Sequence, residues 1–366
     1  MRSMTVTQAK QVAKKWLLAQ GEKLPGLVGA YLSGSLLEKP PQALLPAASD
    51  VDVVLVFSQG NCPKKLGKFQ AEGVLLEGTC LEETEFSPLE RVLSTHYLAF
   101  ALQAGQILWD PQGRLEALHR QVAACYDREE WVHARVQALL DRVRQGLTGP
   151  LPQGYPQRIN GWLFPTGITC FPLLIADLRN CTVRRRYAAA RETLERRGLG
   201  EAYPSLLRLL VPEPLGRERL LPHLEALSES FSLAAESRGP SQDYPFRGDI
   251  SPQGRAAALG GCRELLDSPW PEEAVFWMGA TFARCQSILE LDSPPTAARR
   301  LPYFQKFMED LGIGGEEDLL RRREQVLQAL PWVEGLAAEV ARRRSLDFSR
   351  KTVDKSRREC YSEDVF

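Results

Sequence analysis

Two aspartates stand at the entrance of an apolar strand, where a core strand normally carries no charge. They are Asp50 and Asp52 in "SDVDVVLVF", and four aliphatic residues follow them. Because side chains alternate between the two faces of a strand, both carboxylates point to the same side. Two like charges about 4 Å apart repel by roughly 4 kcal/mol at an effective dielectric constant near 20. The pair therefore predicts either a shared proton or a bound cation, and hard carboxylate oxygens favour Mg²⁺.

A third acid and a Gly-Ser turn lie on neighbouring segments. Glu77 is in the middle of the apolar run "VLLEGT", and a neighbouring antiparallel strand would place it against the aspartates. Upstream, a short apolar strand leads into Gly34 and Ser35. The missing side chain of glycine lets backbone N–H groups approach an anion, while the serine hydroxyl donates to it. A phosphate beside a metal-binding acid cluster indicates phosphoryl or nucleotidyl transfer.

Each of these features also has a plainer explanation. Asp50 and Asp52 would suit a solvated strand entrance, and Gly34-Ser35 would suit any tight turn. The catalytic interpretation is favoured because Asp52 already lies inside the apolar run and Glu77 repeats the anomaly on a second strand. Without the acids, an ordinary turn would be the better explanation of Gly34-Ser35.

The segment that must position these residues is a small unit of mixed helices and strands at 1–113. Its expected elements are a helix within the first twenty residues, strands at 27–32, 50–57, 73–81 and 106–110, and a helix at 88–105. Ser87 and Glu90 predict a capping box at the start of the last helix, with Pro88 at its first position. A compact mixed sheet is the simplest packing of these elements.

From residue 114 onward helical periodicity replaces the strand signals. The helices are expected at 114–148, 163–179, 183–197, 202–211, 253–266, 271–290, 297–311 and 315–345. A stretch rich in proline, glycine and serine at 236–252 predicts a linker or long loop that could divide the helical domain. The sequence therefore predicts an α+β protein with a sheet domain at 1–113, an all-α domain at 114–350 and a flexible tail at 351–366.

The composition of the chain argues against several kinds of partner, including nucleic acid and membranes. The 366 residues are 44% hydrophobic, and 46 basic residues balance 46 acidic ones, so no general nucleic-acid footprint is expected. The eight cysteines form no Cys-x-x-Cys pair, and most sit beside apolar residues, which indicates neither a disulfide framework nor a zinc site. With no signal peptide and no apolar run near eighteen residues, we expect a cytoplasmic protein without a membrane partner.

The spacing of these motifs resembles that of a known superfamily. Gly34-Ser35, a spacer, Asp50-Val51-Asp52 entering an apolar strand and the later strand acid Glu77 resemble the signature of the DNA polymerase β-like nucleotidyltransferases. The helical second half is similar to the small-molecule branch of that superfamily, which includes the aminoglycoside (kanamycin-type) nucleotidyltransferases. The motif-level similarity covers residues 31–118.

The resemblance implies a role for each matching residue. Gly34 and Ser35 would hold the triphosphate of an NTP, Asp50 and Asp52 would ligate Mg²⁺, and Glu77 would complete the metal site or take the proton of the attacking hydroxyl. The implied reaction moves an NMP group from an NTP to a hydroxyl of a small molecule and releases pyrophosphate. The alternative is a non-catalytic nucleotide-binding or regulatory module on the same fold. An RNA-modifying enzyme is disfavoured by the balanced charge.

Several charged groups and one loop stay open. Glu82, Glu83 and Glu85 form an acidic cluster just past the Glu77 strand. A solvated loop is the favoured explanation of this cluster, although it could attract a polycationic acceptor. Arg184, Tyr187 and Arg191 fall on one helical face, where a solvated basic face is favoured over a clamp on triphosphate. His96 is expected to be a packed histidine. The loop at 36–49 either bends away from the metal site or folds over it as a lid.

Overall fold

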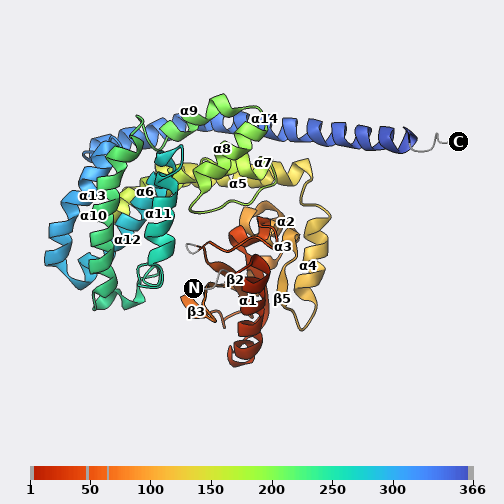
Figure 1. Ribbon diagram of the computed structural model, residues 1–366, viewed down its shortest axis with the longest axis horizontal. Helices are drawn as coiled ribbons and strands as arrows, with labels where there is room; N and C mark the ends of the chain where they lie inside the picture. Colours follow the sequence, from red (N-terminus) through yellow and green to blue (C-terminus); the bar gives the residue numbers. More distant parts are fainter. Residues whose placement is uncertain (1–3, 47–48, 64–65, 362–366) are drawn as a thin grey trace.

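A five-stranded mixed sheet in the N-terminal part of the chain carries the predicted site residues (Figure 1). The computed structural model describes residues 4–46, 49–63 and 66–361. The sheet is followed by a region that is almost entirely helical, so the predicted α+β class is confirmed.

The strands have the order β3-β4-β2-β1-β5 across the sheet. Their bounds are Leu27–Ser33 for β1, Val51–Phe57 for β2, Gly67–Ala71 for β3, Val74–Glu82 for β4 and Ile107–Trp109 for β5. Strand β1 pairs antiparallel with β2 and β5, β4 pairs parallel with β2, and β3 pairs antiparallel with β4.

The strand of Glu77 is thus parallel to the strand of the aspartates, and the prediction of an antiparallel neighbour is wrong. The reason is β3, which the sequence analysis did not anticipate. Strand β3 lies at the edge of the sheet and runs antiparallel to both β2 and β4. The chain therefore reverses direction twice between β2 and β4, and β4 lies between β3 and β2 with the same direction as β2. The sequence "GKFQA" of β3 lacks the apolar run that identifies the buried strands, because one side of an edge strand has no neighbour.

Helices cover both faces of the sheet. Helix α1 (Val6–Gln20) packs on the face formed by alternate residues of β2 such as Val53 and Leu55. The opposite face, which includes Val54 and Val56, packs against the helices α2 (Leu89–Ser94), α3 (His96–Ala104) and α4 (Arg114–Ala123). Helix α4 lies beyond the boundary predicted at residue 113, yet its Leu115 belongs to the core beside the sheet.

The helix predicted at 88–105 is divided into α2 and α3 at Thr95, whose backbone is extended with φ −97° and ψ 107°. The capping box predicted at Ser87 and Glu90 does not form in the described structure at the start of α2. Pro88 occupies the N-cap position of α2 instead of the first helical position, and it has no side chain that could accept a backbone hydrogen bond.

The second region is a bundle with one continuous apolar core. Its helices are α5 (Glu129–Thr148), α6 (Tyr155–Gly167), α7 (Phe171–Ala176), α8 (Arg186–Arg196), α9 (Tyr203–Arg208), α10 (Gly216–Glu236), α11 (Gly261–Leu266), α12 (Val275–Asp292), α13 (Pro294–Asp310) and α14 (Glu316–Tyr361). Residues from both sides of 236–252 share this core, and Ile250 within that stretch is buried in it. Helix α14 continues through residues 351–361, and the remainder of the predicted tail lies outside the described residues.

Helix α10 was not predicted from the sequence. Pro222 lies inside it, and proline removes a backbone donor and disfavours a helix interior. The helix is nevertheless retained because its apolar face, which includes Leu224 and Phe231, packs into the core of the bundle.

Among the described residues, one segment is apolar enough to cross a membrane by length and composition. It spans 155–176, with a mean hydropathy of 1.4 over its most apolar window. That window is 78% buried inside the protein, and the segment is broken into α6 and α7. It therefore forms part of the core of the helical region.

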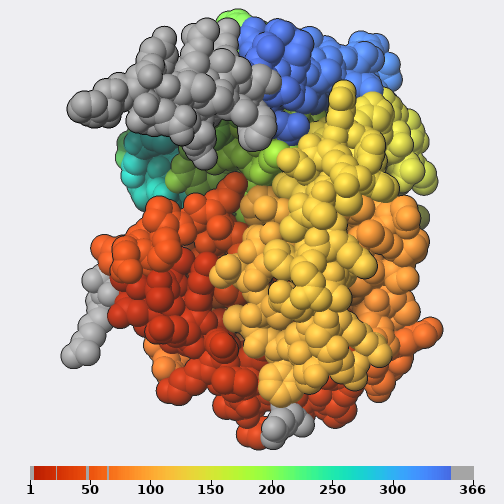
Figure 2. Space-filling model, turned by 90° about the vertical axis from the view of Figure 1, so that its right-hand side faces the viewer, coloured from red at the N-terminus to blue at the C-terminus, as the bar shows by residue number. Residues whose placement is uncertain are grey.

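Helix α5 joins the two regions through a buried arginine. Arg135 is 1% exposed and donates to the backbone carbonyls of Leu93, 3.0 Å away at the end of α2, and of Tyr126, 2.6 Å away. Its guanidinium also lies 4.5 Å from the centre of the Tyr126 ring. Figure 2 shows the residues of α4 and α5, in amber to yellow, as a continuous column that crosses the front of the sheet domain and reaches the helices above it.

We predict that Arg135→Met destabilises the protein by about 3 kcal/mol, because two buried carbonyls lose a charged donor at about 1.5 kcal/mol each. The exposed Arg120 on α4 provides the control, and Arg120→Met should change the free energy of unfolding by less than about 0.5 kcal/mol. Denaturant unfolding measures both values. Equal effects of the two substitutions would contradict the role of Arg135 between the domains.

Candidate metal and phosphate site

Four neighbouring strands place a polar row across one face of the sheet. Ser33 of β1 pairs with Asp52 of β2, Asp52 pairs with Glu77 of β4, and Glu77 pairs with Lys68 of β3. Paired residues of adjacent strands project to the same face, so the register brings these side chains together. Asp50 lies two residues before Asp52, immediately ahead of β2, and completes the group.

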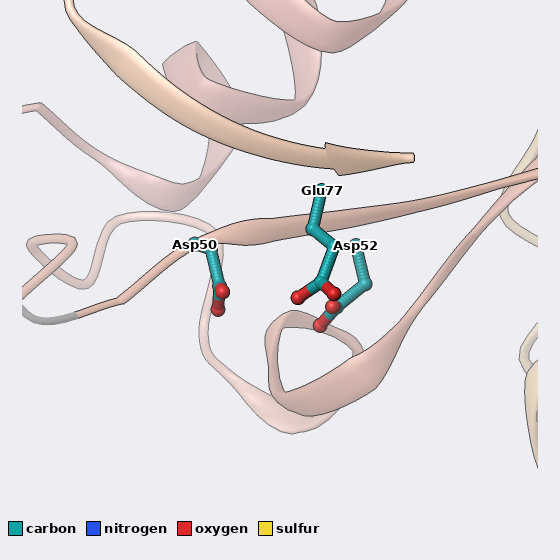
Figure 3. Close-up of side chains that lie close together, drawn as sticks. All are labelled: Asp50, Asp52 and Glu77. Carbon is teal, nitrogen blue, oxygen red and sulfur yellow. The ribbon is translucent and has the colours of Figure 1, made fainter. Parts of the chain in front are cut away.

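The three predicted acids converge in space. One carboxylate oxygen from each of Asp50, Asp52 and Glu77 lies within 4.8 Å of the others, and all three residues are partly buried. Figure 3 shows the three side chains directed to the same side of their strands. Three hard oxygen donors at this spacing are the kind of ligands that a divalent cation takes in proteins. The structure thus brings together the acids that the sequence singled out, and they could hold a metal ion.

A lysine that the sequence analysis missed lies among these acids. Lys68 Nζ forms ion pairs with Asp50 and, at 2.6 Å, with Glu77, and the lysine side chain is only 8% exposed. Burial disfavours its charged form, but the two carboxylates outweigh burial, so the pKa of Lys68 lies above its usual value. The ammonium group therefore stays charged and partly neutralises the acidic cluster.

Gly34 approaches the cluster so closely that no side chain fits there. It has φ +71°, and a Cβ atom built on it would lie 1.8 Å from Oδ2 of Asp52. Gly34 begins a short 3₁₀ helix, Gly34–Glu38, which contains the partly buried Ser35. The predicted Gly-Ser turn thus lies directly against the three acids, and the glycine is required by both its backbone angle and the contact.

The helical region contacts the sheet domain at Glu38 and at Lys68. Glu38, at the end of the 3₁₀ helix, accepts a hydrogen bond from the backbone N–H of Asn180 at 3.0 Å. Asp249 makes the second contact: its Oδ1 lies 4.0 Å from Lys68 Nζ, and its Oδ2 lies 3.2 Å from the guanidinium of Arg284 on α12. Asp249 belongs to the predicted linker at 236–252, so this stretch also contributes a carboxylate beside the site.

The loop at 36–49 is anchored along the start of the chain over its described part. The backbone N–H groups of Val6 and Thr7 donate to the carbonyls of Ala43 and Pro41, at 2.9 and 3.0 Å. Leu44 also forms a β-bridge with Thr5. Residues 41–45 are therefore held against residues 4–7, whereas 47–48 lie outside the described residues.

The arginine-rich face of α8 is packed into the protein, and the prediction of a solvated basic face is wrong. Tyr187 is 1% exposed, and Arg191 pairs with Glu273 at 2.8 Å. Arg184 lies against Gly261, where an added Cβ would meet its Cδ at 2.4 Å. Burial and pairing hold these groups inside the bundle, so they do not form the triphosphate clamp that the sequence left open.

The other charged candidates have structural partners. The acidic cluster past Glu77 contacts its own surroundings, since Glu82 accepts from the backbone of Gly60 at 3.1 Å and Glu83 pairs with Arg114 at 3.1 Å. His96 packs beside the ring of Phe171 with centroids 5.8 Å apart. Burial, with a smaller contribution from nearby arginines, lowers the pKa of His96 to about 4, so it is a neutral packed histidine, as predicted.

Two cavities lie elsewhere in the protein. One of about 700 Å³ is lined by residues of α10 and of the segment 252–263, and another of about 350 Å³ is lined mainly by residues of α4 and β1. None of the three acids lines either of them, so the site is defined by its side chains and not by these cavities.

Lys68 and Asp249 are the residues that sequence reasoning missed. A lysine within "GKFQAEGVLLEGT" suggests an edge strand next to the Glu77 strand, and the short turn between the two runs is the signal that could have indicated it. No comparable signal marks Asp249, because its approach to Lys68 depends on how the helical region packs against the sheet.

No protein-family model and no curated protein sequence matches this chain.

We predict that Gly34→Ala disturbs the acidic cluster, whereas Gly73→Ala does not. Both glycines have positive φ, +71° and +82°, so each substitution carries the same backbone penalty of about 1–2 kcal/mol. Nothing lies within 4 Å of a Cβ on Gly73, but a Cβ on Gly34 would displace the carboxylate of Asp52. Denaturant unfolding and Mn²⁺ titration should show a larger loss of stability and weaker metal binding for Gly34→Ala alone. Identical behaviour of the two variants would show that Gly34 serves only the turn.

Proposed function

We propose that the protein is a magnesium-dependent nucleotidyltransferase that moves an NMP group from an NTP to a hydroxyl of a small molecule and releases pyrophosphate. The observation that carries this proposal is the convergence of Asp50, Asp52 and Glu77 within 4.8 Å on one row of the sheet. Three partly buried carboxylates repel one another, and a divalent cation relieves that repulsion while leaving positions for phosphate oxygens. The contact of Gly34 with Asp52 supports a phosphate position beside the acids.

The reaction exchanges a phosphoanhydride bond of the NTP for a phosphodiester bond to the acceptor. The oxygen of the acceptor hydroxyl attacks the α-phosphorus, the bond to the β-phosphate oxygen breaks, and pyrophosphate leaves with the released electron pair. Glu77 would complete the metal site or take the hydroxyl proton, and the negative charge of Asp50 and Asp52 beside it would favour the transfer of that proton to the site. A bound Mg²⁺ would supply the positive charge that the transferring phosphate needs.

The triphosphate is assigned to the turn at Gly34 and Ser35. The backbone of Gly34 lies against Asp52, so an anion at this turn would lie beside the metal-binding acids. The acceptor is assigned to the side of the site that faces the helical region, because Asn180 and Asp249 both approach from there. Its specificity would then depend on the helical region and not on the sheet.

One observation favours a second candidate function. Lys68 already provides a positive charge between Asp50 and Glu77, and a permanent internal counter-ion would let the acids persist without a metal. In that case the protein would be a non-catalytic nucleotide-binding or regulatory module on the same fold. The distinction is whether nucleotide binding depends on the metal.

Calorimetry with each NTP, with and without Mg²⁺, separates these two functions. We expect an NTP to bind in the presence of Mg²⁺ and to bind at least about tenfold more weakly without it, because the metal bridges the acids and the phosphates. A screen of metabolites and antibiotics for pyrophosphate release then identifies the acceptor. Nucleotide binding that does not depend on Mg²⁺ would favour the non-catalytic module.

We predict that Asp52→Asn abolishes transfer and leaves the fold intact. Transfer should fall by at least about a hundredfold, since a charged group at the reacting phosphate is lost. The temperature of unfolding should stay the same or rise slightly, because one of three repelling carboxylates is removed. Asp141→Asn is the control, since Asp141 is 58% exposed in a surface ion pair and should be silent in both assays. A parallel loss of stability and activity in Asp52→Asn would identify Asp52 as a structural residue.

A further inference from the structure

The ammonium group of Lys68 occupies a position beside Asp50 and Glu77 to which these carboxylates would also attract a divalent cation. It contacts Asp50 and lies 2.6 Å from Glu77, two of the three acids that converge there. The side chains of these acids are 20% and 16% exposed, so water screens the charges weakly. A lysine and a divalent ion repel each other at such short range, so both cannot hold the same carboxylate oxygens.

A further carboxylate lies next to the same ammonium group. Oδ1 of Asp249 is 4.0 Å from Lys68 Nζ, and hydrogen-bond contact requires about 2.8 Å. A small rotation at the end of the lysine side chain spans this difference. A Cβ built on Gly248 would lie 3.5 Å from the backbone nitrogen of Lys68, so this segment runs directly alongside β3.

The position of Asp249 is set by the helical region. Its Oδ2 lies 3.2 Å from the guanidinium of Arg284, a residue that is 7% exposed within α12. Arg284 is in turn covered by the rings of Phe246 and Trp277, whose centres lie 4.4 and 5.2 Å from its Cζ. Asp249 is thus held in place beside the sheet domain, and Lys68 is the group that can move.

We propose that Lys68 is an exchangeable internal cation, which neutralises Asp50 and Glu77 in the metal-free protein and moves to Asp249 when a divalent ion binds. This inference rests on the metal site of the proposed function. It adds that metal binding strengthens an ion pair between the sheet domain and the helical region. Lys68 is therefore a positioning residue that links metal occupancy to the contact between the two domains.

The test combines Mn²⁺ titration with thermal unfolding for Lys68→Met, Asp249→Asn and the double variant. Lys68→Met should bind Mn²⁺ about tenfold more tightly than the wild type, because the competing cation is gone. Without metal its unfolding temperature should fall, since the acids lose their counter-ion, and Mn²⁺ should restore it. Lys14→Met, at an exposed position of α1, should leave both quantities unchanged.

Asp249→Asn should weaken Mn²⁺ binding about tenfold, because the displaced ammonium group loses its acceptor. In the Lys68→Met background the same substitution should have no effect on Mn²⁺ binding. This double-mutant cycle separates the exchange from a structural role, since a loss that acts only through Arg284 would persist without the lysine. Equal effects of Asp249→Asn in both backgrounds would overturn the inference.

Two further outcomes separate this inference from the proposed function. If the cycle behaves as expected but no NTP binds and no pyrophosphate is released, the exchange stands and nucleotidyl transfer is wrong. If the wild type binds no Mn²⁺ while Lys68→Met does, Lys68 is a permanent counter-ion, which overturns the exchange.

Discussion

The carboxylates of Asp50, Asp52 and Glu77, with one oxygen of each within 4.8 Å of the others, repel one another. The other charges of the site compensate this repulsion. Partial burial increases the repulsion, because less water screens the charges than at the surface. The sheet provides one compensating charge in Lys68, which is itself nearly buried. Burial alone would lower the pKa of Lys68, but the neighbouring acids raise it above its usual value, so they keep the ammonium group charged. A divalent cation would compensate the same charges more completely, and this is the physical basis for expecting one.

The strand register is the means by which these charges meet. Asp52, Glu77 and Lys68 come from strands whose order in the sheet differs from their order in the chain, and their pairing aligns them on one face. A slip of one residue in any pairing would turn a side chain toward the opposite face, where α1 packs on apolar residues. The same register thus fixes both the polar row and the apolar contacts of β2 and β4 with the helices on the two faces.

The helical region completes the surroundings of the site. It approaches through Asn180, which binds the end of the Gly34–Glu38 helix, and through Asp249, which faces Lys68. Buried Arg135 ties the region to the sheet domain at a third place, through carbonyls on the sheet side. Of these contacts, that of Asp249 with Lys68 lies beside the acidic cluster. Under the proposed transfer, an acceptor bound there would meet side chains of both regions.

The amino-acid sequence by itself determined the sheet domain, the helical second half and the three acids with Gly34. These features depend on local signals, since a continuous apolar run identifies a buried strand and a charge inside such a run is an anomaly that needs a partner. It did not reveal β3, whose polar edge carries no apolar run, and it misjudged the direction of β4 for that reason. Pro222 inside α10 made that helix hard to predict from the sequence. The sequence also predicted a solvated face at Arg184 and Arg191, because burial depends on segments that are distant in the chain. Only the tertiary structure decided that Lys68 and Asp249 stand beside the acids, because their proximity arises from strand order and domain packing, which no local spacing records.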